Sequence, residues 1–358
     1  MGRNTFTIDW ITAITLLCLG SFGVFILLSI SPSLFWSQLV YLFVAFALMI
    51  GIAQIDSELL WWFAPLGYVL SNLFLLLSYF GPAIRGARRW ILIFGVQLQP
   101  SELIKPFLLL AFSYFLAKYS PRKLANFPIL FILFAIPFFL VFRQPDLGSS
   151  MVYAAFWGTM MMAGGLPVWI FLSGLGAVGV LLPILWSHLA GYQQSRIETF
   201  LNPSLDPAGA GYNALQAMIA VGSGQLFGRG LGRGTQSHLR FLPEFHTDFI
   251  FATLIEELGL LGGFLLLSGY AVLLFRIVWP LTRSVVSDGR LFTFSFGLVA
   301  MLLAQIFINA GMNMGLIPIT GITLPFISYG GSSILSTGVA FGLLWAISRG
   351  VGRSASVA

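Results

Sequence analysis

Cysteine and charged residues are both scarce in this chain of 358 residues. Cys18 is the single cysteine, which excludes an intramolecular disulfide framework and a cysteine-rich metal site. Only 8% of the residues are charged, whereas 58% are hydrophobic and the mean hydropathy is +0.93. Such a balance excludes a soluble globular domain of ordinary composition. We therefore expect a polytopic membrane protein.

Long apolar runs take the place of the missing charge. They predict an all-α fold of about ten transmembrane helices in one integral membrane domain, residues 1–358, with no soluble domain at either end. The runs lie at about 10–30, 34–53, 59–79, 103–116, 127–142, 151–163, 168–186, 248–278, 291–310 and 331–347. The first run is followed by no evident small-residue cleavage site, so we interpret it as a retained span rather than a signal peptide.

Two segments are too rich in glycine and proline to be regular spans. Residues 188–247 are the predicted extracytoplasmic loop between spans seven and eight, with a short amphipathic helix at 213–221. Residues 309–333 read NAGMNMGLIPITGITLPFISYGGSS and should be broken by irregular backbone. Such backbone is tolerated at that depth only where it lines a cavity or is buried in protein. We therefore expect a pocket beside this second segment.

Basic residues lie at both ends of the predicted spans. An even span count puts both termini on one side, which the positive-inside rule makes cytoplasmic. The residues on that side are Arg3, Lys118, Arg122, Lys123, Arg283, Arg290, Arg349 and Arg353. Those on the opposite side are Arg85, Arg88, Arg89 and Arg143 in short loops and Arg196, Arg229, Arg233 and Arg240 in the long loop. Cations gathered outside suit a phosphate or pyrophosphate ligand, although pairing with Asp146, Glu198, Glu244 or anionic lipid would also explain them.

Charged residues within the predicted spans are candidates for function, because each costs on the order of 2.5 to 3.5 kcal/mol at mid-bilayer. Glu102 and Lys105 are spaced i, i+3 at the head of a helix and could form a structural ion pair or help bind a phosphate. Asp248 and Glu256 would lie roughly 80° apart around one helix and roughly 12 Å apart along it, so both could line one cavity. Glu257 points nearly opposite Asp248 and is expected to contact another helix.

The polar cluster around Asp248 has two interpretations. Thr247 or Asp248 could cap the helix that follows, because a short oxygen side chain satisfies backbone N–H groups there. Alternatively, a carboxylate at the lipid boundary beside the imidazole of His246 has a tunable pKa and could act as a general base.

Five segments together resemble the SEDS family of bacterial cell-wall proteins, and its RodA-like branch rather than its FtsW-like branch. The segments are GARRWI at 86–91, QPSELIK at 99–105, RQPDLGS at 143–149, FLPEFHTDFIFA at 241–252 and LPFISYGGSS at 324–333. The branch is indicated by DPAGAGYN at 206–213 and GTQSHLRFLPE at 234–244.

The resemblance implies a multi-pass protein of the bacterial plasma membrane that polymerises lipid II into peptidoglycan glycan strands during cell-wall elongation. Asp248 matches the family's essential aspartate, and Trp90, Glu102 and Lys105 match other positions linked to activity. Arg88, Arg89 and Arg196, with Lys105, could stabilise the pyrophosphate leaving group outside the membrane. A divalent cation could share that role, and a class B penicillin-binding protein is the implied partner.

Two other classes of function are compatible with the same residues. A flippase for the lipid-linked precursor would also have charged residues in its spans and a broken segment near Pro325. A non-catalytic scaffold that recruits a transpeptidase would not need Asp248 at all. The polymerase is the hypothesis that uses the most of these features.

Overall fold

The computed structural model describes residues 9–83, 87–93, 95–188, 191–206, 209–282 and 288–357. Every predicted apolar run coincides with a helix. This is expected, because backbone groups in a membrane must form their hydrogen bonds within the protein. These helices are α1 Trp10–Ile30, α2 Pro32–Ala53, α3 Ser57–Ser78, α5 Lys105–Lys118, α6 Phe127–Arg143, α7 Leu147–Ala163, α8 Val168–His188, α12 Ile250–Thr282, α13 Gly289–Asn313 and α14 Gly331–Val357. The polytopic all-α class is therefore confirmed.

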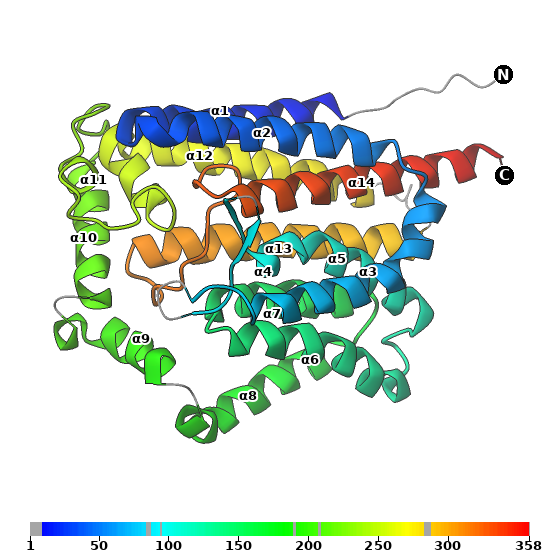
Figure 1. Ribbon diagram of the computed structural model, residues 1–358. Coiled ribbons are helices and arrows are strands. Elements are labelled where there is room, and N and C mark those ends of the chain that lie inside the picture. Colours follow the sequence, from blue (N-terminus) through cyan, green and yellow to red (C-terminus); the bar gives the residue numbers. More distant parts are fainter. Residues whose placement is uncertain are drawn as a thin grey trace.

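Seven helices of the described chain are long and apolar enough to cross a membrane: α1, α2, α3, α6 with the turn before it, α12, α13 and α14. The count of ten spans stays a prediction, because α5 and α7 have only 14 and 17 residues. The helices lie side by side in one bundle, with α14 packed along α2 and α13 packed along α7 and α5 (Figure 1). In the most apolar 18-residue stretch of α14, 83% of the residues are buried, so this helix belongs to the interior.

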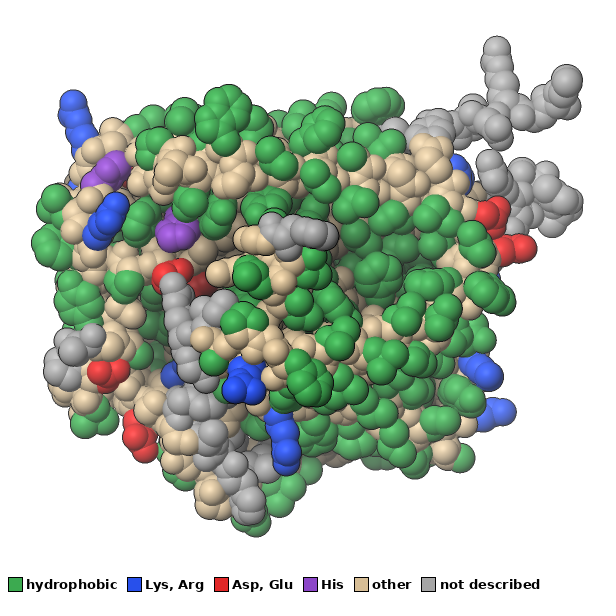
Figure 2. Space-filling view, in the orientation of Figure 1, with side chains coloured by type: hydrophobic (Ala, Val, Ile, Leu, Met, Phe, Trp, Pro, Cys, Tyr) green, Lys and Arg blue, Asp and Glu red, His purple; other side chains and the backbone are tan. Residues whose placement is uncertain are grey.

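The two ends of the bundle carry the polar residues. Arg276 near the end of α12 donates to Asp9 at the start of α1 at 2.7 Å, and Arg349 near the end of α14 donates to the Gln54 carbonyl after α2 at 2.7 Å. Figure 1 shows these helix ends at one side and the segment 188–247 at the other. Hydrophobic side chains form a broad belt between the charged ends in Figure 2. This is the distribution expected of a protein that spans a bilayer.

Shorter elements lie between the long helices. They are the β-hairpin β1 Ile91–Ile93 and β2 Val96–Leu98, the helices α4 Pro100–Leu103, α9 Gly191–Leu201, α10 Ala210–Ser223 and α11 Thr235–His238, and the 3-10 turns at Leu124–Asn126 and Pro203–Leu205. The helix predicted at 213–221 corresponds to α10, whereas α9 and the hairpin were not predicted. Both are short and largely polar or exposed, so hydrophobic periodicity gives little signal for them.

Helix α12 is interrupted at Gly259, whose φ is 70° and ψ is −171°. The sequence predicts a continuous helix over 248–278, so the break is revealed only by the tertiary structure. Residues 225–230 of the loop approach the break and satisfy the backbone groups that it frees. The bonds run from Arg229 N to Glu256 O at 2.9 Å, Gly230 N to Glu257 O at 3.0 Å, Leu260 N to Gln225 O at 2.8 Å and Leu261 N to Leu226 O at 3.2 Å.

Residues 314–330, which we call the irregular segment, connect α13 to α14 without forming a helix. This agrees with the predicted interruption of 309–333. Ile322, Leu324, Phe326 and Ile327 are at most 2% exposed, so this backbone is buried in protein as its polar groups require. The irregular segment lies among α12, α13, α14 and α7 and positions the candidate site.

Candidate active site

Asp248 lies in a turn just before α12 and is partly exposed. A Cβ atom added to Gly321 of the irregular segment would lie 3.3 Å from Asp248 Oδ2, so the carboxylate is in contact with that backbone. The Thr247 hydroxyl donates to Glu244 Oε2 at 3.0 Å, and a cap of α12 by Thr247 or Asp248 stays a prediction. The N–H of Ala252, in the first turn of α12, donates to Asn313 Oδ1 at 3.1 Å.

His246 lies beside Asp248 and faces the irregular segment. Its ring centroid is 5.7 Å from that of Tyr329, and its carbonyl accepts a hydrogen bond from Tyr329 N at 2.8 Å. These contacts place the imidazole of His246 against the irregular segment. Its exact role stays a prediction.

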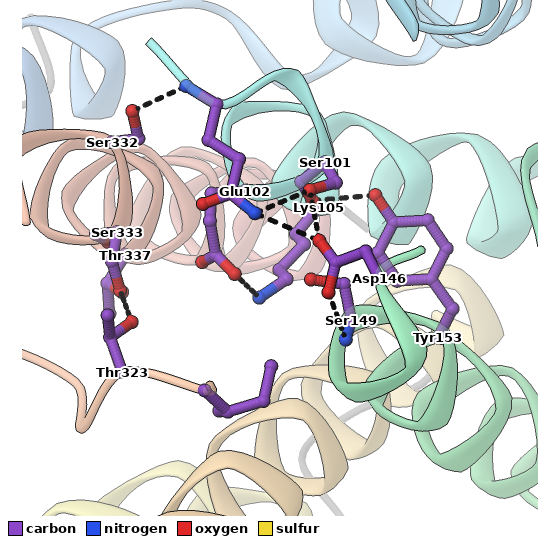
Figure 3. A network of polar contacts seen from close by, with 12 residues as sticks. Ser101, Glu102, Lys105, Asp146, Ser149, Tyr153, Thr323, Ser332, Ser333 and Thr337 are labelled. Atoms are coloured by element: carbon purple, nitrogen blue, oxygen red, sulfur yellow. Dashed lines mark hydrogen bonds and ion pairs between the residues drawn. The ribbon is translucent and has the colours of Figure 1, made fainter. Parts of the chain in front are cut away.

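Glu102 and Lys105 form a buried ion pair, with 2.5 Å between Lys105 Nζ and Glu102 Oε1. Lys105 is 0% exposed and Glu102 is 4% exposed. Glu102 Oε2 is buried and has no hydrogen-bond partner among the described residues. Figure 3 shows the two side chains pointing toward each other. A buried pair of this kind costs desolvation energy, which is weak evidence for a purely stabilising role.

Asp146 caps α7 and receives donors from the segment before α5. Its Oδ1 accepts from Ser149 N at 3.1 Å, and its Oδ2 accepts from Gln99 Nε2 at 2.9 Å and Ser101 Oγ at 3.0 Å. Arg89 Nη1 is 3.9 Å from Asp146 Oδ1. Figure 3 shows Asp146 bonded to Ser101, with the Glu102–Lys105 ion pair beside them as a separate contact. Asp146 therefore holds loop and helix together and pairs weakly with Arg89.

The irregular segment joins this network to Asp248. A Cβ atom on Gly148, in the first turn of α7, would lie 2.5 Å from Ile322 Cγ1, and Gly321 is the residue that contacts Asp248. Further along, Ser332 Oγ accepts from Gln99 N at 2.9 Å. The irregular segment thus lies next to both the carboxylate of Asp248 and the first turn of α7.

The cations predicted to lie outside the membrane have different places in the structure. Arg88 is exposed, Arg89 has a side chain that is 21% exposed, and Trp90 is half-buried. Arg196 on α9 lines a cavity of about 40 Å³ whose other wall includes Gly315, Ile317, Pro318 and Ile319 of the irregular segment. Arg89 therefore lies near Asp146 and Arg196 near the irregular segment, whereas Arg88 and Trp90 are neighbours of Arg89 in the sequence. Arg85 lies outside the described residues.

Glu256 has a different place from the one expected. It is 0% exposed and its carboxylate accepts from Gln236 N at 2.9 Å, from Thr235 Oγ1 at 3.2 Å and from Ser237 Oγ at 3.3 Å. The prediction that it lines a substrate cavity with Asp248 is corrected on this point: both of its oxygens anchor the loop. The predicted angle requires one continuous helix from Asp248, whereas α12 begins at Ile250.

Glu257 contacts α1 as expected, because its Oε1 accepts from Ser29 Oγ at 3.0 Å. The same oxygen also bonds Gly232 N at 3.1 Å and lies 2.9 Å from His238 Nε2. Glu256 and Glu257 thus both hold the loop that fills the break in α12.

Sequence reasoning missed the polar residues that support the site from within. Asn309 and Asn313 on α13 bond the backbone of Asp248, and Gln99 and Ser332 connect α4 to α14. The i, i+4 spacing of two asparagines in an apolar helix is a signal that could have identified the first pair. Among the described residues, no group of three or more His, Cys, Asp or Glu could hold a metal ion.

Known proteins resemble this chain over most of its length. A family model for FtsW, RodA and SpoVE, described as "Cell cycle protein", matches residues 5–352. Peptidoglycan glycosyltransferase MrdB of Escherichia coli strain K12 is 39% identical over 303 residues, which cover 84% of this chain and 81% of MrdB. Stage V sporulation protein E of Bacillus subtilis strain 168 is 40% identical over 281 residues, covering 75% of this chain and 73% of that protein.

Two solved structures share the fold. One chain of a peptidoglycan synthase complex described as coordinating polymerization and crosslinking has a TM-score of 0.82 and 29% identity, and covers 96% of this chain and 98% of that one. The rod shape determining protein RodA of Thermus thermophilus has a TM-score of 0.73 and 28% identity, and covers 97% of this chain and 98% of that one.

Proposed function

This chain belongs to the SEDS family of FtsW, RodA and SpoVE, and we propose that it is a peptidoglycan glycosyltransferase that polymerises lipid II. Lipid II is a disaccharide peptide linked to a polyprenyl chain through a diphosphate. The expected reaction has two requirements: a base for the attacking sugar hydroxyl and positive charge for the departing diphosphate.

Asp248 is the proposed general base. The hydroxyl oxygen of the acceptor sugar forms a bond to the anomeric carbon of the donor sugar, and the carbon–oxygen bond to the diphosphate breaks. The hydroxyl proton passes to the Asp248 carboxylate, and the bonding electron pair leaves with the diphosphate. This assignment rests on the position of Asp248, which is partly exposed and lies against Gly321. The next residue, Ile322, lies against the first turn of α7.

Basic residues near the irregular segment are proposed to receive the diphosphate. Arg89 lies near Asp146 on its solvent side, Arg88 is its exposed neighbour in the sequence, and Arg196 lies against the start of the irregular segment. Lys105 is buried against Glu102, so it would act on an anion that enters the network rather than on one at the surface. Trp90 is half-buried next to Arg89 and could pack against a sugar or the polyprenyl chain. His246, beside Tyr329, completes the set proposed to contact substrate.

The family and the bundle support a proposal for location and partner. We propose that both termini are cytoplasmic and that the Asp248 end of the bundle is extracytoplasmic, where 188–247 form the long loop. Because a chain of a peptidoglycan synthase complex shares this fold, a class B penicillin-binding protein is the proposed partner. A divalent cation bound with the substrate would supply further positive charge for the diphosphate, and removal of divalent ions with a chelator tests whether polymerisation needs one.

The deciding experiment is the polymerisation of purified lipid II by the purified chain in detergent, with and without Asp248→Asn. The variant should lose activity by about 10²- to 10⁴-fold, the usual contribution of a general base. Its thermal stability should change by less than about 1 kcal/mol, because the side chain is isosteric and partly exposed.

Asp206→Asn is the matched control, because Asp206 is a loop carboxylate that caps α10 by accepting from Ala210 N at 2.7 Å. It should keep full polymerase activity. Polymer made in detergent needs no second compartment, so a flippase alone would yield none from the parent. A scaffold would tolerate Asp248→Asn, and equal product from parent and variant would remove Asp248 from the reaction.

A further inference from the structure

Three consecutive backbone carbonyls at the candidate base are each fixed by a side chain or backbone group from another element. His246 O accepts from Tyr329 N at 2.8 Å, and Thr247 O accepts from Ser328 Oγ at 2.7 Å. Asp248 O accepts two bonds at 3.0 Å, from Asn309 Nδ2 and Asn313 Nδ2. The turn that carries the carboxylate is therefore fixed at three successive residues by groups from other elements.

The asparagine pair, Asn309 and Asn313, does more than bond Asp248. Asn309 Nδ2 also donates to Ile322 O at 2.7 Å, which connects Asp248 to the residue next to Gly321. Asn313 Oδ1 accepts from Ala252 N at 3.1 Å, which connects Asp248 to the first turn of α12. Both side chains are 0% exposed on α13. One helix thus fixes the base, the helix that follows it and the backbone that it touches.

The orientation of both amides follows from their partners. Each Nδ2 faces two carbonyl oxygens, since Asn313 Nδ2 also donates to Asn309 O at 2.7 Å. If the Asn313 amide were flipped, its oxygen would face two carbonyls and its NH₂ group would face the N–H of Ala252. The donors of both amides are therefore fully used in holding the backbone.

We propose that Asn309 and Asn313 are positioning residues for Asp248, and that they set the distance and direction of its carboxylate relative to the attacking sugar hydroxyl. This inference rests on the proposed glycosyltransferase function. It follows because catalytic groups must be held to within about 0.5 Å, and displacements of about 1 Å can cost about 10²-fold in rate. Two bonds to one carbonyl fix the peptide plane that carries the Asp248 Cα.

A purely structural role makes a different prediction. Asn72 on α3 is a buried asparagine of the same kind, but its Nδ2 donates at 2.8 Å to Tyr68 O within its own helix. Loss of that bond should lower stability without reaching Asp248. Asn72→Ala is therefore the matched control for Asn309→Ala and Asn313→Ala.

The experiment measures kcat and KM for lipid II polymerisation by the full-length chain in detergent, well below the melting temperature of each variant. Asn309→Ala and Asn313→Ala should each lower kcat by about 10- to 100-fold, because the carboxylate is misplaced. KM should stay within about threefold, because neither side chain reaches the proposed diphosphate site. Hydrogen exchange at residues 247–253 should become faster in both variants and stay unchanged in Asn72→Ala.

The outcomes separate this inference from the proposed function. A parent chain that makes no polymer overturns the proposed function and the inference with it. An active parent whose two variants keep kcat, or lose only as much as Asn72→Ala at equal loss of melting temperature, overturns the inference alone. If Asn313→Ala fails to insert in the membrane, Asn309→Ala decides, because it leaves the bond between Asn313 and Ala252 in place.

Discussion

Arg89 is placed between solvent and a buried carboxylate. Its side chain is 21% exposed, and its Nη1 lies 3.9 Å from Asp146 Oδ1, beyond ordinary hydrogen-bond distance. Its Nε is buried and has no hydrogen-bond partner among the described residues. Asp146 already accepts from three other donors, so it does not depend on this arginine. A guanidinium in this position is available for a phosphate oxygen.

Arg89→Ala should therefore raise KM for lipid II by about tenfold, the loss of about 1.4 kcal/mol that one charge-assisted contact provides. The value of kcat should stay within about threefold, and the amount of protein in the membrane should not change. Steady-state polymerisation measures both constants. Arg349→Ala, at the opposite end of the bundle, is the control and should alter neither; an unchanged KM in Arg89→Ala would return this arginine to a structural role.

The break in α12 decides how the active end of the bundle is built. The half-helix from Ile250 to Leu258 follows the candidate base, and residues 225–230 supply hydrogen bonds where the helix is interrupted. The buried carboxylates of Glu256 and Glu257 hold this loop, through Gln236 of α11 and through Gly232. The position of Asp248 therefore depends on this contact between the loop and the half-helix. Both are far from α13 in the sequence.

Gly259→Ala should destabilise the protein by on the order of 2 to 4 kcal/mol, from backbone strain and overpacking together. The φ of Gly259 is +70°, and an added Cβ would lie 2.3 Å from Gly228 N and 2.4 Å from Leu226 O. Thermal unfolding in detergent measures the change. Gly222→Ala on α10 is the control, because an added Cβ meets nothing within 4 Å and alanine favours a helix. Equal melting temperatures for both variants would show that the break tolerates a side chain.

At the scale of the whole molecule, the bundle has one apolar belt and two polar ends with different contents. The irregular segment, the Asp146 network and the loop 188–247 share one end, whereas Arg276, Arg349 and the α2–α3 turn share the other (Figure 1). This separation means that the proposed chemistry occurs on one side of the membrane only. The orientation of the bundle determines whether that side can meet an exported precursor.

Single-cysteine labelling tests the orientation, because Cys18 is the only cysteine and can be replaced by serine. Arg233→Cys and Glu58→Cys, at exposed positions at the two ends, should behave oppositely. A membrane-impermeant maleimide should label Arg233→Cys in intact cells and Glu58→Cys only after lysis. The reverse pattern would put Asp248 in the cytoplasm and contradict a polymerase that acts outside.

The sequence by itself determined the class of protein, the positions of the ten helices in the chain, the interruption between α13 and α14, and the family. Each of these depends on composition, on runs of apolar residues or on short motifs, which are local properties. The tertiary structure alone decided that Asp248 contacts Gly321, that Glu256 anchors a loop, that α12 breaks at Gly259 and that Asn309 and Asn313 hold the turn of the base. In an apolar bundle, hydropathy does not say which face of a helix meets which neighbour, because lipid and protein interior are equally apolar. Packing makes that choice, and it brings together groups that are 60 to 300 residues apart, such as Asp248 with Asn309 and Arg349 with Gln54.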